Sequence, residues 1–185
     1  MNKALQYMFW GYLFIFFRIQ IGIDWLADPI GYLFISSGCL LLLKQYPHAK
    51  KARITAMIGA IISIPSVFIN LIQPTFGIWE LYSVSLFSLK LIVAYFLFAV
   101  LKSIVADYGN QILIQRTKNV YTFYIAFHLA SLLLMSFSMN VPEYPWATFV
   151  FALSIGVLIM DIAFLLLIGA IRRAEPPEVS IDHLV

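Results

Sequence analysis

Three ionisable residues lie deep inside long apolar segments, where charged groups are costly: Lys90, His128 and Asp161. Counted from the basic ends of their segments at about 1.5 Å per residue, all three lie roughly 13 to 18 Å deep, near a membrane midplane. An unpaired charge there costs at least ~2.5 kcal/mol, whereas a nearby opposite charge keeps both groups ionised or lets them share a proton. We predict a midplane ion pair of Lys90 and Asp161, with His128 nearby as a structural donor or a proton carrier.

A second polar layer lies nearer the opposite ends of these segments and contains Arg18, Asp24, Asp28 and Glu80. Arg18 precedes Asp24 by about one and a half helical turns, so its long side chain can extend toward any of the three carboxylates. One interpretation is a brace between helices. The other is an entrance for an anionic solute, because the planar guanidinium suits carboxylate or phosphate and Lys90 can line the same path.

Small polar residues recur at helical spacing along four of the segments. They form a predicted polar stripe of Ser63, Ser66, Asn70, Ser83, Ser131 and Ser154. Residues three, four or seven apart share one helix face, so each set faces protein or water. Either these residues let helices pack closely, with hydrogen bonds of about 0.6 to 2 kcal/mol each, or the stripes converge on a polar cavity.

The elements that position these residues are six apolar segments, each near the length that crosses a ~30 Å hydrocarbon core as a helix. They cover residues 4–23, 29–46, 54–73, 78–102, 119–140 and 147–171. Apart from Arg18 and Lys90, every Lys and Arg lies at a terminus or in every second gap, whereas Asp24, Asp28, Glu80 and Glu143 lie in or beside the other gaps. This alternation predicts six spans with both termini in the cytoplasm.

The predicted fold is therefore an all-α, polytopic transmembrane bundle of three helical hairpins. One bundle covers residues 1–171, and residues 172–185 form a flexible cytoplasmic tail. The longest cytoplasmic link, Ile104–Asn119, contains three consecutive apolar residues between polar ones. We expect it to lie along the membrane surface as a short amphipathic helix.

Composition limits the class of protein. The chain is 62% hydrophobic and 11% charged, which cannot present a soluble surface, so the lipid bilayer is the expected partner. Its net positive charge comes from the cytoplasmic loops and does not indicate binding to nucleic acid. The three histidines have no metal-ligand spacing, and no zincin motif, phosphate loop or nucleophile elbow is present. We predict no metal, no cofactor and no catalytic residues, although Asp161 and His128 could serve an intramembrane enzyme as acid and base.

One segment carries a resemblance. The sequence from Asp24 to Tyr32 reads DWLADPIGY and is followed by an apolar run and Gly38. It resembles a D-I-L-P-D-x-I-G-Y motif in functionally uncharacterised small multi-pass membrane proteins of Gram-positive Firmicutes, from which it departs at Ala27 and Pro29. The resemblance covers about a sixth of the chain. It implies a multi-pass protein of the bacterial cytoplasmic membrane and no particular chemistry.

Three classes of function remain after these exclusions. A small transporter or channel-like protein requires the midplane layer to be wet. A non-catalytic accessory or regulatory subunit requires surfaces that pack against a partner membrane protein or another copy of the chain. An enzyme requires an acid and a base beside a substrate cleft, and it is the least favoured of the three.

Overall fold

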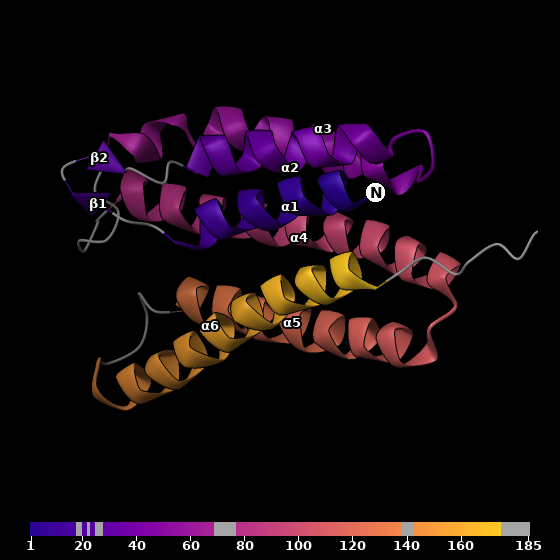
Figure 1. The fold of residues 1–185 in the computed structure, drawn as a ribbon. Coiled ribbons are helices and arrows are strands. Elements are labelled where there is room, and N and C mark those ends of the chain that lie inside the picture. The colour runs from indigo at the N-terminus through magenta and orange to yellow at the C-terminus, as the bar shows by residue number, and fades with distance from the viewer. Residues whose placement is uncertain (18–19, 22, 25–27, 69–76, 138–142, 175–185) are drawn as a thin grey trace, which may run out of the picture.

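The computed structural model describes the chain except for residues 18–19, 22, 25–27, 69–76, 138–142 and 175–185 (Figure 1). The described part has the elements α1 (Asn2–Phe16), β1 (Gln20–Ile21), β2 (Ile23–Asp24), α2 (Asp28–Leu42), α3 (His48–Ile62), the 3-10 turn η1 (Ile64–Val67), α4 (Ile78–Tyr108), α5 (Gln111–Phe137) and α6 (Glu143–Arg173). The predicted all-α class is confirmed, since the strands of the described residues form only one short antiparallel pair.

Three helices are long and apolar enough to cross a membrane. They cover Ile78–Tyr108, Gln111–Ser136 and Thr148–Arg173, with 31, 26 and 26 residues. At 1.5 Å per residue they are about 39 to 46 Å long, which exceeds the ~30 Å hydrocarbon core. Helices α1, α2 and α3 have 15 residues each, so each is about 22 Å long. The described residues thus contain three candidate membrane spans, and the first three helices are shorter than predicted.

The first predicted span, 4–23, ends as a helix at Phe16 and continues into the β1–β2 pair. In this pair Gln20 lies opposite Asp24, and Ile21 lies opposite Ile23. The sequence alternates isoleucine with glutamine, glycine and aspartate here, and β-branched residues with a period of two favour a strand over a helix.

The other helix bounds also differ from prediction at informative places. Helix α3 begins at His48 and ends at Ile62, whereas the predicted span covered 54–73. Pro65 follows in η1, and proline has no N–H to continue a helical ladder. At the C-terminus, α6 continues through Arg173 into the predicted tail, of which residues 175–185 lie outside the described part.

The prediction of a surface helix at Ile104–Asn119 is wrong. Helix α4 continues to Tyr108 and α5 begins at Gln111, so only two residues join them. Gly109 ends α4 in the left-handed conformation, with φ of +65°. The side-chain oxygen of Asn110 then accepts a hydrogen bond from the Leu113 N–H at 3.1 Å, which caps α5. The apolar residues of the link therefore belong to a long helix.

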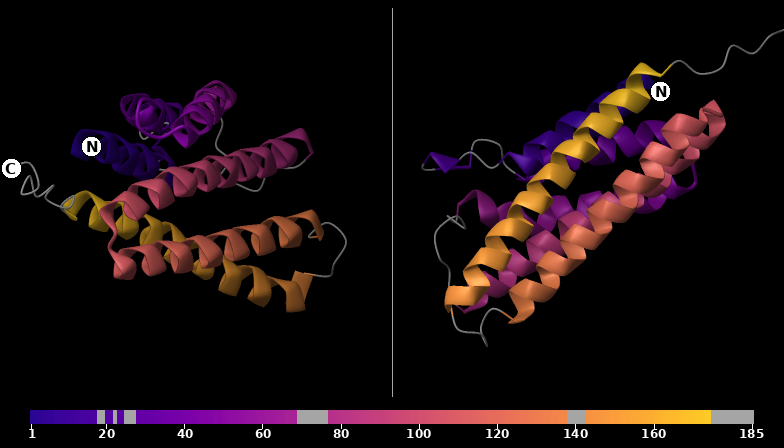
Figure 2. Two further views of the ribbon diagram at one scale, coloured as in Figure 1. Left: turned by 90° about the vertical axis from the view of Figure 1, so that its right-hand side faces the viewer. Right: turned by 90° about the horizontal axis from the view of Figure 1, so that it is seen from below.

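Successive helices run in opposite directions and each packs against the next, while α1 also packs against α6 (Figures 1 and 2). The N-terminus, the α2–α3 and α4–α5 connections and the end of α6 consequently lie at one end, which we call the basic end. The β1–β2 pair and the starts of α2, α4 and α6 lie at the other, which we call the acidic end (Figure 1). Lys and Arg gather at the basic end, whereas Asp24, Asp28, Glu80 and Glu143 belong to the acidic end.

Four aromatic side chains fill the interior between α1, α4, α5 and α6. Tyr12, Phe98, Tyr124 and Phe164 are each at most 1% exposed. The Phe98 and Phe164 ring centroids lie 4.5 Å apart, and those of Tyr12 and Phe164 lie 4.6 Å apart. We call these four residues the aromatic layer. On α4, Phe98 lies closer to the basic end than Lys90, and on α6, Phe164 lies closer to it than Asp161. The aromatic layer therefore closes the centre of the bundle on the side toward the basic end.

Helices α1 and α2 approach until their backbones touch. A Cβ atom placed on Gly31 would lie 2.6 Å from the Gly11 carbonyl oxygen. Such contact requires residues without side chains, as is usual where membrane helices pack closely. At the basic end, Tyr46 donates a hydrogen bond to Asp107 at 2.8 Å. Burial and this bond raise the pKa of Tyr46 to about 12, so its hydroxyl remains a donor at neutral pH.

Candidate functional site

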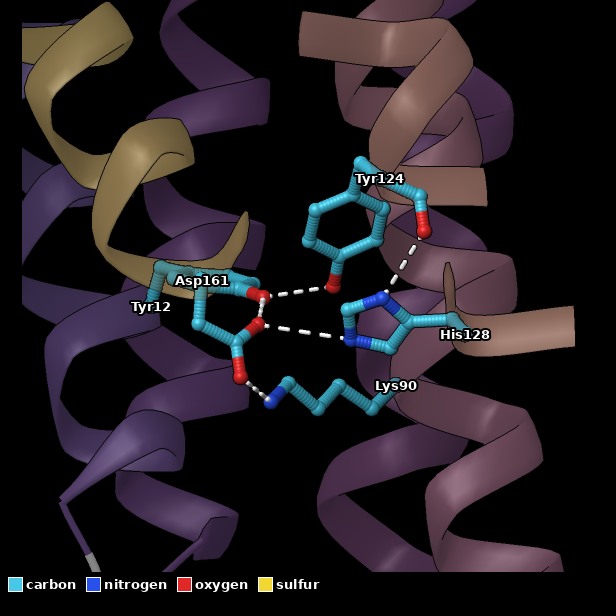
Figure 3. Close-up of polar contacts among 5 residues, drawn as sticks. All are labelled: Tyr12, Lys90, Tyr124, His128 and Asp161. Carbon is cyan, nitrogen blue, oxygen red and sulfur yellow. Dashed lines mark hydrogen bonds and ion pairs between the residues drawn. The ribbon is translucent and has the colours of Figure 1, made fainter. Parts of the chain in front are cut away.

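The Asp161 carboxylate lies at the centre of a buried polar cluster (Figure 3). Its Oδ2 accepts a hydrogen bond from Lys90 Nζ at 2.6 Å, and its Oδ1 accepts one from the Tyr12 hydroxyl at 2.5 Å. The Nε2 atom of His128 lies 3.4 Å from Oδ1. The structure thus brings the three predicted midplane residues together, and their side chains are 14% (Lys90), 4% (Asp161) and 0% (His128) exposed.

Helical periodicity aims these side chains inward from four helices. On α6, Asp161, Phe164, Leu165 and Ile168 are all buried, at the spacing of one helix face. On α5, half of the residues of described burial are exposed, but Tyr124 and His128, one turn apart, are completely buried. A charged group on one of these buried faces contacts protein rather than lipid. An otherwise apolar helix can therefore contain such a group at little cost.

His128 has a defined tautomer in this cluster. Its Nδ1 lies 2.9 Å from the Tyr124 carbonyl oxygen, which can only accept, so Nδ1 carries a hydrogen. In a neutral ring Nε2 then presents a lone pair to Oδ1 of Asp161, and two acceptors repel each other. A proton on either Nε2 or Oδ1 makes this contact favourable. A single proton between these two atoms would therefore join them.

Two tyrosines extend the cluster and were not predicted as site residues. The Tyr12 hydroxyl gives its hydrogen to Asp161, so it accepts from the Tyr124 hydroxyl, which is 2.5 Å away. Tyr12 is the only residue with a hydroxyl group among the buried residues of α1.

A cavity of about 290 Å³ leads from the acidic end to Lys90. It lies between α1, α2, α4 and α5 and is lined by Ile15, Phe16, Asp28, Tyr32, Ser83, Leu86, Phe87, Lys90 and Met135. Lys90 is the residue of this lining farthest from the start of α4, so it forms the floor. Its ammonium also lies 5.6 Å from the Tyr12 ring centroid and 5.9 Å from that of Phe16, which adds cation–π attraction.

A second cavity of about 410 Å³ lies between α4, α5 and α6. Glu80, Ser131 and Ser154 contribute its polar groups, and the rest of its lining is apolar. Phe87 and Met135 line both cavities and so form the partition between them. The predicted outer polar layer is therefore divided, because Asp28 lines one cavity and Glu80 the other.

Several predicted contacts cannot be placed. Arg18 and Asn70 lie outside the described residues, and of Asp24 only the backbone is described, in β2. The predicted bond of Arg18 to a carboxylate thus stays a prediction.

The predicted polar stripe also divides. Ser83, Ser131 and Ser154 line the cavities. Ser63 and Ser66 are buried, but each hydroxyl bonds a nearby carbonyl, of Ala60 at 3.3 Å and of Ser63 at 2.7 Å. These two serines line neither cavity and satisfy the turn that ends α3. Only part of the stripe could thus contact a solute.

In the described part of the chain, no three His, Cys, Asp or Glu side chains are placed to hold a metal ion. No protein-family model matches the chain, and neither a curated protein nor a solved structure is significantly similar to it.

Proposed function

We propose that this chain is a small six-span transport protein of the bacterial cytoplasmic membrane, with both termini in the cytoplasm. The orientation of the helices supports six spans. Successive helices alternate in direction, and α1, α2 and α3 extend between the same two ends of the bundle as the three long helices (Figure 1). Helices of about 22 Å can cross if the bilayer thins locally. The choice of membrane rests on the motif from Asp24 to Tyr32.

The observation that supports transport is the position of the charged cluster. It lies at the floor of a cavity that extends toward the acidic end, and the aromatic layer closes the other side. A transporter holds its site near the midplane and exposes it to one side at a time. We take this arrangement as the outward-facing state, in which the charged cluster is reached by a solute from the acidic end. No catalysis, metal or cofactor is involved.

An accessory or regulatory subunit is the second candidate, and one observation favours it. The Lys90 ammonium is already engaged by the Asp161 carboxylate and two aromatic rings. An ammonium group with all its partners inside the protein is typical of a structural ion pair. Such a group has fewer hydrogens left to bind a solute. In that case the cavity would contain no water, and the chain would act by packing against a partner protein.

The topology can be tested by thiol labelling in intact cells. On a Cys39→Ala background, Lys51→Cys and Lys118→Cys should resist a membrane-impermeant maleimide added outside, and Glu143→Cys should react. The reason is that basic loops stay in the cytoplasm. Labelling of the first two variants in sealed cells would show that the orientation is wrong.

The same method distinguishes a wet cavity from a dry one. Ser83 lines the cavity, whereas Ser85 is exposed on the surface of α4, and both hydroxyls bond the carbonyl four residues earlier. We expect Ser83→Cys to react with a charged methanethiosulfonate added outside and Ser85→Cys to remain unmodified in lipid, where a thiolate does not form. Equal protection of both positions would favour the accessory subunit.

A further inference from the structure

A third cavity, of about 320 Å³, lies between α4 and α5 at the basic end. It is lined by Lys102, Val105, Ile114, Thr117 and Lys118. It is separate from the charged cluster and shares no lining residue with the other two cavities. Its lining combines two ammonium groups with two aliphatic side chains, and it contains no carboxylate.

The two ammonium groups are not neutralised within the described part of the chain. They lie close enough to repel each other electrostatically. No carboxylate of the described residues forms an ion pair with either of them, and the nearest acid along α4, Asp107, accepts the Tyr46 hydroxyl instead. An anion between Lys102 and Lys118 would relieve this repulsion.

The geometry also fixes where the anion would lie. Lys102 Nζ is held 3.3 Å from the centroid of the Tyr121 ring, so this ammonium is positioned rather than free. The Thr117 hydroxyl donates to the Leu113 carbonyl at 2.8 Å and is not available as a third donor. Binding must therefore come from the two lysines, with Val105 and Ile114 forming an apolar wall beside them.

We propose that this cavity binds the headgroup phosphate of an anionic phospholipid in the cytoplasmic leaflet. A soluble anion would gain nothing from Val105 and Ile114, whereas a phospholipid places its first acyl carbons directly beside its phosphate. Basic pockets between helices on the cytoplasmic side suit such lipids, since that leaflet is negatively charged. The bound lipid would tie α4 to α5 across their two-residue connection, whether or not the chain transports a solute.

The test uses the full chain reconstituted in phosphatidylcholine vesicles, with and without one part in four of phosphatidylglycerol. We expect the anionic lipid to raise the midpoint of thermal unfolding by about 2–4 °C. Lys102→Gln/Lys118→Gln should lose this shift, and Lys102→Arg/Lys118→Arg should keep it. The control, Lys50→Gln/Lys51→Gln, removes two exposed lysines at the same end of the bundle and should keep it as well.

Three outcomes would overturn the assignment. If the control loses the shift as fully as the cavity variant, the lipid acts only through general surface charge. If inorganic phosphate with phosphatidylcholine reproduces the shift, the site takes a soluble anion. If the glutamine variant keeps the shift, the two lysines do not hold the lipid. Because each comparison is made within one variant, a loss of basal stability does not obscure the result.

Discussion

Replacing either Lys90 or Asp161 alone should destabilise the protein by about 3–5 kcal/mol, because each change leaves the other charge buried without its partner. Lys90→Met strands a carboxylate that is 4% exposed, and Asp161→Leu strands an ammonium in an apolar interior. The double variant Lys90→Met/Asp161→Leu should recover much of the loss, since both charges are removed together. Unfolding in detergent, followed as a double-mutant cycle, measures this coupling.

The same cycle separates the two candidate functions. The control Lys50→Met removes an exposed lysine at the basic end and should change stability by no more than about 0.5 kcal/mol. If the pair is only structural, the folded double variant will retain its cellular function. If the cluster is a transport site, the folded double variant will lose it. Strictly additive single effects would mean that Lys90 and Asp161 do not interact, contrary to the structure.

Gly31→Ala should destabilise the protein by about 1–3 kcal/mol, although alanine ordinarily stabilises a helix. The added Cβ would lie 2.6 Å from the Gly11 carbonyl oxygen, and backbone atoms can yield only if α1 and α2 separate. Tyr12 follows Gly11 directly, so the separation should also disturb its hydrogen bond to Asp161. Unfolding in detergent and the Tyr12 ring signal in NMR spectra report the two effects.

Gly169→Ala is the matched control for this change. Gly169 also lies within a helix, α6, but nothing lies within 4 Å of a Cβ placed there. Alanine at this position should be neutral or should stabilise by up to about 1 kcal/mol. Equal destabilisation by both substitutions would show that the contact between α1 and α2 does not account for the effect at Gly31.

The all-α class and the grouping of the midplane residues could be predicted from the sequence. A helix has a fixed rise, so counting residues placed Lys90, His128 and Asp161 at similar depth, and the cost of a lone charge in lipid required partners. The structure brings these side chains together. Tyr12 was missed because a tyrosine in a membrane span costs little and therefore gives no warning.

Other features depend on information that hydropathy does not contain. A hydropathy average treats Ile19, Ile21 and Ile23 as helix formers, although their alternation favours a strand. It also ends a helix where charges begin, whereas α4 and α5 continue past Lys102 and Lys118 until Gly109 and Asn110 permit a turn. The partition of the cavities by Phe87 and Met135 depends on side-chain packing between three helices, which no local pattern reports.

The ion pair between Lys90 and Asp161 joins residues 71 positions apart, and this separation matters while the chain is being made. At about 5–20 residues per second, a ribosome adds Asp161 roughly 4–14 s after Lys90. During that interval the fourth helix carries a cation whose counterion has not yet been synthesised. If the proposed transmembrane topology holds, the nascent α4 must be held by the insertion machinery, or at the water interface, until α6 arrives. A chain truncated before residue 161 would keep this charge without its counterion.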